Sequence, residues 1–390
     1  MTQHHRKISA IVRNLLTWFS ENARDLPWRQ TRNPYAIWVS EIMLQQTQVK
    51  TVLSFWERWM RELPTIESVA RARLQKIHKL WEGLGYYTRV RNLQKAARMI
   101  LQKHNGQFPK RFEDILALPG IGRYTAGAIS SIAFNHPAPI LDGNVMRVLT
   151  RIFGIAESPR DKRTNQRLWQ IAEELVRNSL SKTQHSRMAC SHLNQSLMEL
   201  GALVCTPRNP QCGTCPVKKL CVAFKEDRTA ELPNLGKREK ATARRFVAFV
   251  VERDGQFLVR RRPAGVVNAH LWEFPNVEIL SDTREEKDER HANGHASLAR
   301  AAREMGLDFH NAGPICTIKH SITRYRMTLD AFLIELKKTP RISDGVWLSH
   351  AKLDSLPLTS AHRKVLRNIT TMCHTDLHVP SARAVTAGTP

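Results

Sequence analysis

The chain has 390 residues, of which 42% are hydrophobic, and a net charge of +25 from 60 basic and 35 acidic side chains. No run approaches the roughly 18 apolar residues of a membrane-spanning helix, which excludes such a helix. A positive field of this size favours a polyanion, so we expect nucleic acid as the partner and no membrane. The first residues, MTQHHRKISAIVRN, contain no apolar signal core, and we expect an intracellular, cytoplasmic protein.

Residues 1–225 predict a helical domain, because apolar side chains recur at every third or fourth position. Prolines separate the apolar stretches and mark the turns between them. A helix is predicted from residue 5 onward, and further helices are predicted at 36–60, 66–81, 89–103, 111–117, 123–134, 143–153 and 164–180.

Glu41 is the first candidate catalytic residue along the chain. Its neighbours three and four positions away in the predicted helix include Ile37, Trp38 and Leu44, which are all apolar. Desolvation by such neighbours raises the pKa of a carboxyl, and a carboxyl that is protonated near neutral pH can act as a general acid. The ordinary alternative is a partly exposed glutamate on an amphipathic helix.

The segment LPGIGRYTAG, residues 118–127, lies between two predicted helices and contains Gly120 and Gly122. Glycine permits a tight turn and the close approach of another backbone. The N–H groups that begin the following helix point outward and are suited to binding phosphate. The alternative is an ordinary turn between helices, but in a chain of charge +25 we expect DNA-backbone binding here.

Asp142 lies twenty residues beyond Gly122, shortly before the amphipathic run VMRVLTRIF. An aspartate in this place ordinarily caps the N-terminus of a helix. Considered without its surroundings, Asp142 therefore indicates a cap rather than a catalytic group.

Four of the seven cysteines lie in one short segment, CTPRNPQCGTCPVKKLC. Cys205, Cys212, Cys215 and Cys221 have the spacing C-x6-C-x2-C-x5-C, which predicts a metal site with either an iron–sulfur cluster or zinc. Zinc sites usually contain two C-x2-C pairs or paired Cys and His, whereas only one C-x2-C is present here. Two disulfides are the remaining alternative, and they require an oxidising compartment.

The composition changes after residue 225. Residues 226–245 are polar and basic and predict a linker. Runs at 246–251 and 256–260 predict two strands, and the Asp254-Gly255 step between them predicts a hairpin. Residues 246–373 are therefore expected to form a smaller α+β domain, with strands at 315–321, 325–336 and 345–349, a polar loop at 281–295, a helix at 296–305 and a disordered tail at 374–390.

These motifs together resemble a known family. LPGIGRYTAG, Asp142 and the four-cysteine loop resemble the helix-hairpin-helix DNA glycosylases of the endonuclease III type. Further motifs, which cover residues 5–225 densely, are similar to those of the MutY-type adenine DNA glycosylases: Asp25–Arg29, Pro34–Tyr35, Trp38–Thr47, Gly83–Tyr87 and Glu199–Cys205. The likeness is weaker beyond residue 240, where LWEFP at 271–275 fits the family's Nudix-like domain. The resemblance implies a mainly α protein with an all-helical helix-hairpin-helix domain and a Nudix-like α+β domain.

The resemblance implies excision of adenine opposite 8-oxoguanine or guanine in double-stranded DNA, after the adenine has left the base stack. It implies that Glu41 protonates the leaving adenine at N7 and that Asp142 stabilises the oxocarbenium-like sugar, either electrostatically or through a transient covalent bond. Tyr124 and Asn144 orient the sugar site and Asp142. Other matched positions contact DNA or the lesion, namely Trp28, Arg29 and Gln195 in the adenine pocket, Gln46 and Tyr86 as wedge residues, and Thr47, Leu84, Gly120 and Gly122.

The resemblance also implies that the four cysteines hold a 4Fe–4S cluster. The residues between them include Arg208, Lys218 and Lys219, which a folded loop can present to phosphate. We expect the protein to act as a monomer.

One position distinguishes the family members that also cleave the DNA backbone. They carry a lysine two residues after the second hairpin glycine, and its amine forms a Schiff base with the sugar. This chain has Tyr124 there, and a phenol cannot form an imine. We therefore expect base removal without β-elimination.

The C-terminal domain departs from the family pattern. Members often carry Phe-Ser-His in a strand that contacts oxidised guanine, and the matching residues here are Ile322, Thr323 and Arg324. Thr323 keeps a hydroxyl and Arg324 keeps N–H donors, so we expect lesion recognition in altered form. The segment AAREMG at 301–306 lacks the paired glutamates that hold Mg²⁺ in a Nudix hydrolase, so nucleotide hydrolysis is not expected.

Two rival functions are compatible with parts of the pattern. A monofunctional glycosylase for thymine opposite guanine shares similar N-terminal motifs, but the additional C-terminal domain argues against it. A non-catalytic, cluster-bearing DNA-binding protein is disfavoured because Glu41, Asp142 and Tyr124 all occupy matched positions.

Overall fold

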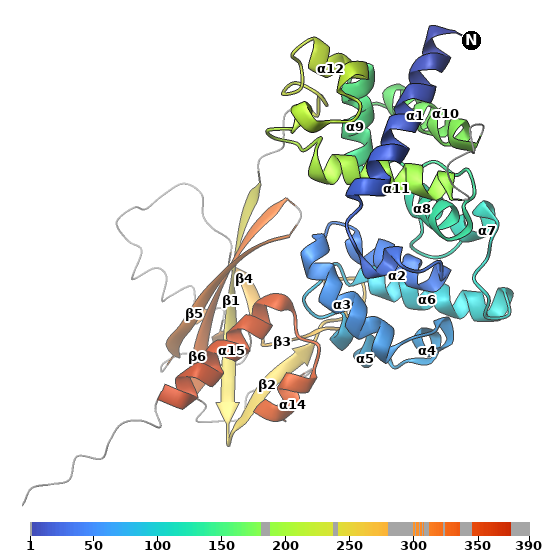
Figure 1. Ribbon diagram of the computed structural model, residues 1–390. Coiled ribbons are helices and arrows are strands. Elements are labelled where there is room, and N and C mark those ends of the chain that lie inside the picture. The colour runs from blue at the N-terminus through green and yellow to red at the C-terminus, as the bar shows by residue number, and fades with distance from the viewer. Residues whose placement is uncertain are drawn as a thin grey trace, which may run out of the picture. The chain divides into compact units, whose positions relative to one another are not determined.

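A computed structural model describes residues 2–180, 188–236, 241–279, 312–322, 324–335 and 345–375, with isolated residues between 299 and 307. The chain divides into two compact units. The first contains Met1–Leu80 and Thr88–Arg238, and the second contains Trp81–Tyr87 and Glu239–Pro390. Figure 1 shows that helices build the first unit and that a sheet with helices builds most of the second.

The core of the first unit forms around its N-terminal helix. In α1 (Gln3–Asn22) the Thr2 hydroxyl caps the N-terminus by accepting from the N–H of His5. Apolar side chains three or four positions apart make one face of α1, and this face is buried: Ile8, Ile11, Val12, Leu15 and Phe19. It packs against α10 (Lys162–Leu180) and α11 (Ala189–Leu203), and α9 (Gly143–Phe153) completes the same core.

Two of the predicted helices are wrong in extent. Residues 36–60 form two helices, α2 (Pro34–Leu44) and α3 (Val49–Glu62), because Gln46 takes a left-handed conformation with φ 57°. Arg89 stabilises this break, since its Nη1 donates to the last carbonyls of α2, including those of Ile42 and Met43 at 3.0 Å each. Residues 66–81 likewise form α4 (Ile66–Arg71) and α5 (Leu74–Leu80).

The other helical predictions are confirmed to within two residues at each end. They correspond to α6 (Thr88–Lys103), α7 (Phe112–Leu116), α8 (Arg123–Phe134), α9 and α10. The helix α11 was not predicted. After it, the cysteine segment forms two short 3-10 turns and one helical turn, namely η2 (Cys212–Thr214), η3 (Lys218–Leu220) and α12 (Val222–Lys225).

A close contact fixes α8 against the segment that leads to Asp142. A Cβ atom at Gly127 would lie 2.2 Å from the carbonyl oxygen of Pro139, so no larger residue fits there. The same segment is held from the other side by Asn194, whose Nδ2 donates to the Ala138 carbonyl at 2.8 Å. These contacts position Asp142 relative to Tyr124 in α8.

The second unit is built on a mixed sheet with the path β3-β2-β1-β6-β5. Its strands are β1 (Thr242–Arg253), β2 (Gln256–Arg261), β3 (Trp272–Glu273), β4 (Asn276–Ile279), β5 (Ala312–Ile322), β6 (Tyr325–Glu335) and β7 (Gly345–Ser349). The predicted hairpin between β1 and β2 is confirmed, because Asp254 and Gly255 have φ values of 52° and 70°, as a type I′ turn requires.

Alternating side chains of β1 give the sheet two apolar faces. Val247 and Phe249 belong to the cluster on one face, and Ala248 and Val250 belong to the cluster on the other. After the short α14 (His350–Ser355), the helix α15 (Ser360–Thr375) covers the second face, as Figure 1 shows. The prediction of a mainly α chain with a smaller α+β domain is confirmed.

Some predicted features lie partly or wholly outside the described residues. The loop at 281–295 and Thr323 lie wholly outside the described residues. Half of the predicted helix at 296–305 and most of the predicted tail at 374–390 also lie outside them. The predicted linker, 226–245, overlaps the beginning of β1, and α15 continues two residues into the predicted tail. The domain limits stay predictions.

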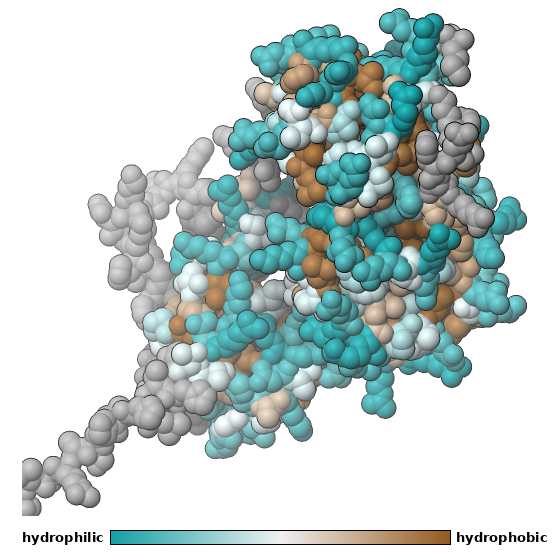
Figure 2. Space-filling view, viewed as in Figure 1, coloured by the Kyte–Doolittle hydropathy of each residue, from teal (hydrophilic) through white to brown (hydrophobic). Residues whose placement is uncertain are grey.

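Hydrophilic residues cover much of the face seen in Figure 2, with hydrophobic residues in small patches between them. Among the helices of the described ranges, none combines the length and the apolar character that a membrane crossing requires.

We predict that Gly127→Ala destabilises the first unit by about 1–3 kcal/mol, because the methyl group overlaps the Pro139 carbonyl and forces α8 away from it. The measurement is the urea-unfolding midpoint followed by far-UV circular dichroism. Gly213→Ala is the matched control, since a Cβ atom there meets nothing within 4 Å. Its free energy of unfolding should stay within about 0.5 kcal/mol of that of the parent. Equal midpoints for both variants would contradict the close contact.

Candidate active site and cysteine loop

One open pocket in the first unit collects side chains from several elements, and five of them supply most of the residues discussed below. They are η1 (Pro27–Arg29), α2, α8, the N-terminus of α9 and α11. All four candidate catalytic residues line the pocket, together with five of the predicted DNA-contact residues: Glu41, Tyr124, Asp142 and Asn144, with Trp28, Arg29, Gln46, Thr47 and Gln195. The structure therefore brings together residues that are far apart in the sequence.

Glu41 is buried, with 5% of its surface exposed. The Tyr124 hydroxyl donates to Oε2 of Glu41 at 2.9 Å and contacts the sulfur of Met198 at 3.3 Å. Burial raises the pKa of Glu41 to about 7, against the hydrogen bond from Tyr124, and the nearby Asp142 raises it further while Arg29 lowers it. Burial also raises the pKa of Tyr124, so the phenol keeps its proton and remains a donor. A large share of Glu41 is therefore protonated at neutral pH.

Asp142 is both a helix cap and a pocket residue, so the two interpretations of this residue are compatible. Its Oδ1 accepts from the backbone N–H of Val145 at 2.7 Å, and its Oδ2 accepts from Nδ2 of Asn144 at 3.1 Å. Burial raises the pKa of Asp142, while these hydrogen bonds lower it. The N-terminus of α9 further favours the anion. Burial outweighs these hydrogen bonds, so the pKa of Asp142 is raised overall. The hydrogen bonds and the helix N-terminus nevertheless stabilise the anion of Asp142, whereas burial favours the protonated form of Glu41.

Arg147 connects this carboxylate to the cysteine loop. Its Nη2 donates to Oδ1 of Asn144 at 2.9 Å and to the Gly201 carbonyl at 2.7 Å, and its Nε donates to the Cys205 carbonyl at 2.8 Å. One turn further along α9, the buried Arg151 donates to the Thr206 carbonyl at 2.7 Å and lies 3.4 Å from the Cys205 sulfur. The helix that Asp142 caps therefore also anchors the cysteine loop.

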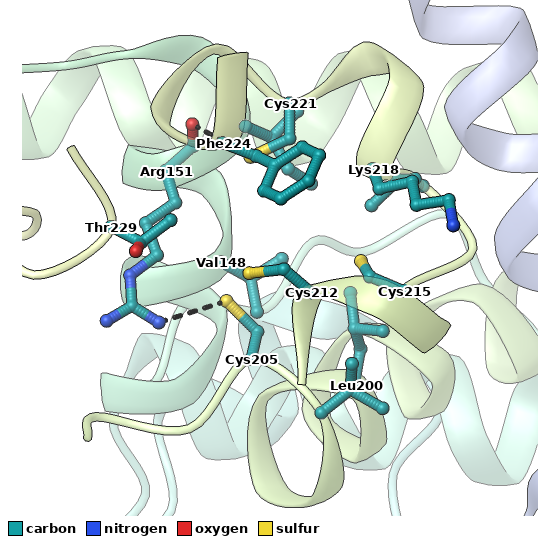
Figure 3. A pocket seen from close by; sticks show the side chains of 13 residues that line it. Val148, Arg151, Leu200, Cys205, Cys212, Cys215, Lys218, Cys221, Phe224 and Thr229 are labelled. Atoms are coloured by element: carbon teal, nitrogen blue, oxygen red, sulfur yellow. Dashed lines mark hydrogen bonds between the residues drawn. The ribbon is translucent and has the colours of Figure 1, made fainter. Parts of the chain in front are cut away.

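The four cysteines of the loop line one cavity, and Figure 3 shows their side chains around a common space. Apolar side chains complete the wall, including those of Val148, Leu200, Val217 and Phe224. The four thiols are free, which contradicts the disulfide alternative.

The donor set of this cavity is four thiols, with apolar side chains around them. Thiolates are ligands of both zinc and iron–sulfur clusters. The cavity therefore contains the ligands that an iron–sulfur cluster requires.

The remaining predicted residues do not line the pocket. Gly120 has φ 80°, and a Cβ atom there would lie 2.6 Å from Cβ of Asn92, so this position requires glycine. Gly122 is the N-cap residue of α8. Leu84 and Tyr86 belong to the 81–87 segment, where Leu84 is buried and Tyr86 is exposed.

In the second unit, Arg324 lies in the turn between β5 and β6, and its Nη2 donates to the Tyr325 hydroxyl at 3.2 Å. Thr323, its predicted partner in lesion recognition, lies outside the described residues.

Among the pocket residues that were not predicted as site residues are Arg24, Met198 and Glu199. Arg147, which connects the pocket to the cysteine loop, was not predicted either. Glu199 carried a signal, because an acidic residue inside the apolar run LMELGALV is buried only when it is paired. Nothing in the sequence pointed to its partners, which lie about 170 positions earlier.

Family models match three parts of the chain. Residues 39–174 match the HhH-GPD superfamily of base excision DNA repair proteins. Residues 205–221 match the iron–sulfur binding domain of endonuclease III, and residues 246–368 match the NUDIX domain. The cysteine loop is therefore an iron–sulfur domain, and the cofactor is a 4Fe–4S cluster.

Proteins named adenine DNA glycosylase match almost the whole chain. The mouse protein is 32% identical, and the match covers 92% of this chain and 78% of the mouse protein. The Arabidopsis thaliana protein is 38% identical, and the match covers 90% of this chain and 63% of that protein. The solved structure of a thermostable thymine-DNA glycosylase is 30% identical to this chain, with a TM-score of 0.52. The match covers 58% of this chain and 100% of that protein. Given the mouse likeness over both chains, this chain belongs to the adenine DNA glycosylase family of base-excision repair enzymes.

Proposed function

We propose that this enzyme removes adenine opposite 8-oxoguanine or guanine in double-stranded DNA, by hydrolysis and without a Schiff base. The observation that carries the proposal is the pairing of Glu41 and Asp142 in one pocket, one carboxyl with a pKa near 7 and the other at a helix N-terminus. The choice of adenine is supported by the names of relatives that match about nine-tenths of this chain, at 92% and 90% of its length.

The two carboxyl groups divide the chemistry between them. The adenine first leaves the base stack, at a cost of a few kcal/mol, and enters the pocket. Glu41 then gives its proton to N7 of the base while the bond from the sugar C1′ to N9 breaks and its electron pair stays on the base. The ionised Asp142 stabilises the positive sugar until water adds a hydroxyl group to C1′ and releases a proton. Tyr124 orients Glu41, and Asn144 orients Asp142.

A Schiff base requires an amine at the sugar. Among the side chains that line the pocket in the described part of the chain, none is a lysine, and Tyr124 occupies the position after the hairpin. The pocket thus offers the carboxylate of Asp142 to the sugar and no lysine amine. This supports hydrolysis, without a Schiff base, as the route by which the base is lost.

Further contacts complete the proposal. Cys205, Cys212, Cys215 and Cys221 hold the cluster and position the basic side chains of the loop toward phosphate. The N-terminus of α8 after Gly122 binds the DNA backbone, and Gln46 and Tyr86 enter the duplex. Thr323 and Arg324 read the oxidised guanine, and the enzyme acts as a monomer in the cytoplasm.

Thymine opposite guanine is the second candidate substrate. It is favoured by the likeness to the thermostable thymine-DNA glycosylase, which is 30% identical to this chain. The whole of that protein is matched by 58% of this chain, and this chain also contains the NUDIX match at 246–368. The additional domain therefore favours adenine.

We predict excision from duplexes with adenine opposite 8-oxoguanine and adenine opposite guanine, and none from thymine opposite guanine. Strand breaks should form only after hot alkali, because the enzyme leaves an intact abasic site. The assay follows end-labelled duplexes on a denaturing gel, with and without alkali. Strand breaks without alkali, or a protein–DNA adduct trapped in good yield by borohydride, would contradict the hydrolytic route.

We predict that Glu41→Gln lowers the single-turnover excision rate by about 10²–10⁴-fold, because the amide cannot protonate the leaving base. DNA affinity, measured by fluorescence anisotropy, should change little, since the side chain keeps its shape. Asp142→Asn should likewise lower the excision rate and leave the DNA affinity almost unchanged. The control is Glu173→Gln, an exposed residue of α10 paired with Arg177, which should leave the rate unchanged. Near-full excision by Glu41→Gln would remove the assigned role.

We predict that Cys215→Ser lowers the iron content per chain and weakens the broad visible absorbance, because one of the cluster ligands is lost. Cys190→Ser is the matched control, since this buried cysteine lies outside the loop and should leave iron and absorbance unchanged. Iron and acid-labile sulfide are measured chemically on both purified variants. Zinc in place of iron in the parent protein would refute the cluster assignment.

A further inference from the structure

Glu199 is a third buried carboxyl at the pocket, and the reaction described above does not use it. It lies on α11, where Gln195, Met198, Glu199 and Ala202 form one face that lines the pocket. Only 1% of the Glu199 side chain is exposed. Its position places a permanent charge beside the bases that enter the pocket.

Two arginines from another part of the chain surround this carboxylate. Arg24 donates to it through its backbone N–H at 2.9 Å, Nε at 2.8 Å and Nη2 at 2.7 Å. Arg29 donates through Nη1 at 3.1 Å and Nη2 at 2.9 Å. Burial alone would raise the pKa of Glu199, but the hydrogen bonds from Arg24 and Arg29 lower it to about 2. Glu199 is therefore ionised at every pH at which the enzyme works.

Arg29 is held in one position by these contacts. Its Nη1 also donates to the Arg24 carbonyl at 3.1 Å, its guanidinium lies 5.4 Å from the centre of the Phe19 ring, and only 14% of its side chain is exposed. Its charge lowers the pKa of Glu41. The electrostatic effect of Arg24 and Arg29 on Glu41 therefore depends on how much of their positive charge Glu199 offsets.

Charged and titratable groups face Glu41 from four elements. Tyr124 approaches from α8 and Asp142 from the N-terminus of α9. Arg29 approaches from η1, and Glu199 lines the same pocket from α11. Of these, Arg29 is the cation whose effect opposes protonation of Glu41, and Glu199 is its counter-charge.

We propose that Glu199 is a positioning residue whose carboxylate fixes Arg24 and Arg29 at the wall of the base pocket and offsets their charge, so that Glu41 keeps the proton that it gives to the leaving base. The inference rests on the proposed role of Glu41 as general acid. Glu199 itself is buried while Arg24 is about one-third exposed, at 34% of its side chain. Desolvation of a buried carboxylate offsets much of the attraction to its partners, which is consistent with a role at the site.

The test replaces the charge and preserves the shape. Glu199→Gln leaves both guanidinium groups without a counter-charge, so Glu41 loses its proton at lower pH. The rate falls where Glu41 is deprotonated, so the alkaline limb of the rate profile should move to lower pH. We expect a displacement of about one pH unit, which corresponds to about a tenfold loss of rate above the limb.

Two further variants distinguish charge from packing. Glu199→Asp keeps the charge, and its limb should lie between those of the parent and Glu199→Gln. Arg24→Gln removes one of the two cations, so its limb should stay in place or move to higher pH, the opposite direction from Glu199→Gln. Glu173→Gln, distant in α10, should superimpose on the parent.

The experiment measures single-turnover excision of adenine opposite 8-oxoguanine between pH 5 and 9 for the full chain with its cluster. A Glu199→Gln profile that is lower at all pH values but has an unmoved limb would overturn the inference and leave the function intact. If Glu199→Gln does not fold, a limb of Arg24→Gln that moves to lower pH overturns it instead. A different result would contradict the proposed function itself, namely full excision activity of Glu41→Gln.

Discussion

Burial of several carboxyl groups around one pocket is the constraint on which the rest of this structure depends. A buried carboxylate costs free energy unless it is neutralised, hydrogen-bonded or paired with a cation. The pocket contains one example of each solution. Glu41 keeps its proton, Asp142 accepts hydrogen bonds at the N-terminus of α9, and Glu199 pairs with two arginines. Three residues of similar chemistry thus acquire different charges, and an acid and an anion can work side by side.

The helix α9 joins this chemistry to the cofactor domain. Asp142 caps its N-terminus, Asn144 and Arg147 follow within the first turns, and Arg147 and Arg151 hold the backbone of the cysteine loop. The backbone of the cysteine loop is therefore attached to the same helix that Asp142 caps. A loop folded by its cluster supports the position of α9, although its cysteines line a separate cavity from the pocket that contains Glu41.

The break after α2 has a consequence for the site. A continuous helix over 36–60 would keep Gln46 and Thr47 within a helical turn, whereas the left-handed residue at Gln46 turns both toward the pocket. Arg89 satisfies the carbonyls that this break exposes. The apolar periodicity runs on through the break, so periodicity alone could not reveal it. The helix prediction was wrong at the place where two of the predicted DNA-contact residues, Gln46 and Thr47, line the pocket.

Local spacing was enough to predict most of the helices, the Asp254-Gly255 hairpin, the four-cysteine loop and the apolar surroundings of Glu41, because each depends on residues within a few positions of one another. Tyr124, at the position where a lyase has lysine, was identified from the resemblance to a family. The pairing of Tyr124 with Glu41, of Arg147 with the Cys205 carbonyl, and of Glu199 with Arg24 and Arg29 joins residues 58 to 175 positions apart. Such pairs, and the charges that they set, arise only when α2, α8, α9 and α11 pack together, since desolvation and hydrogen bonding act through space and not along the chain.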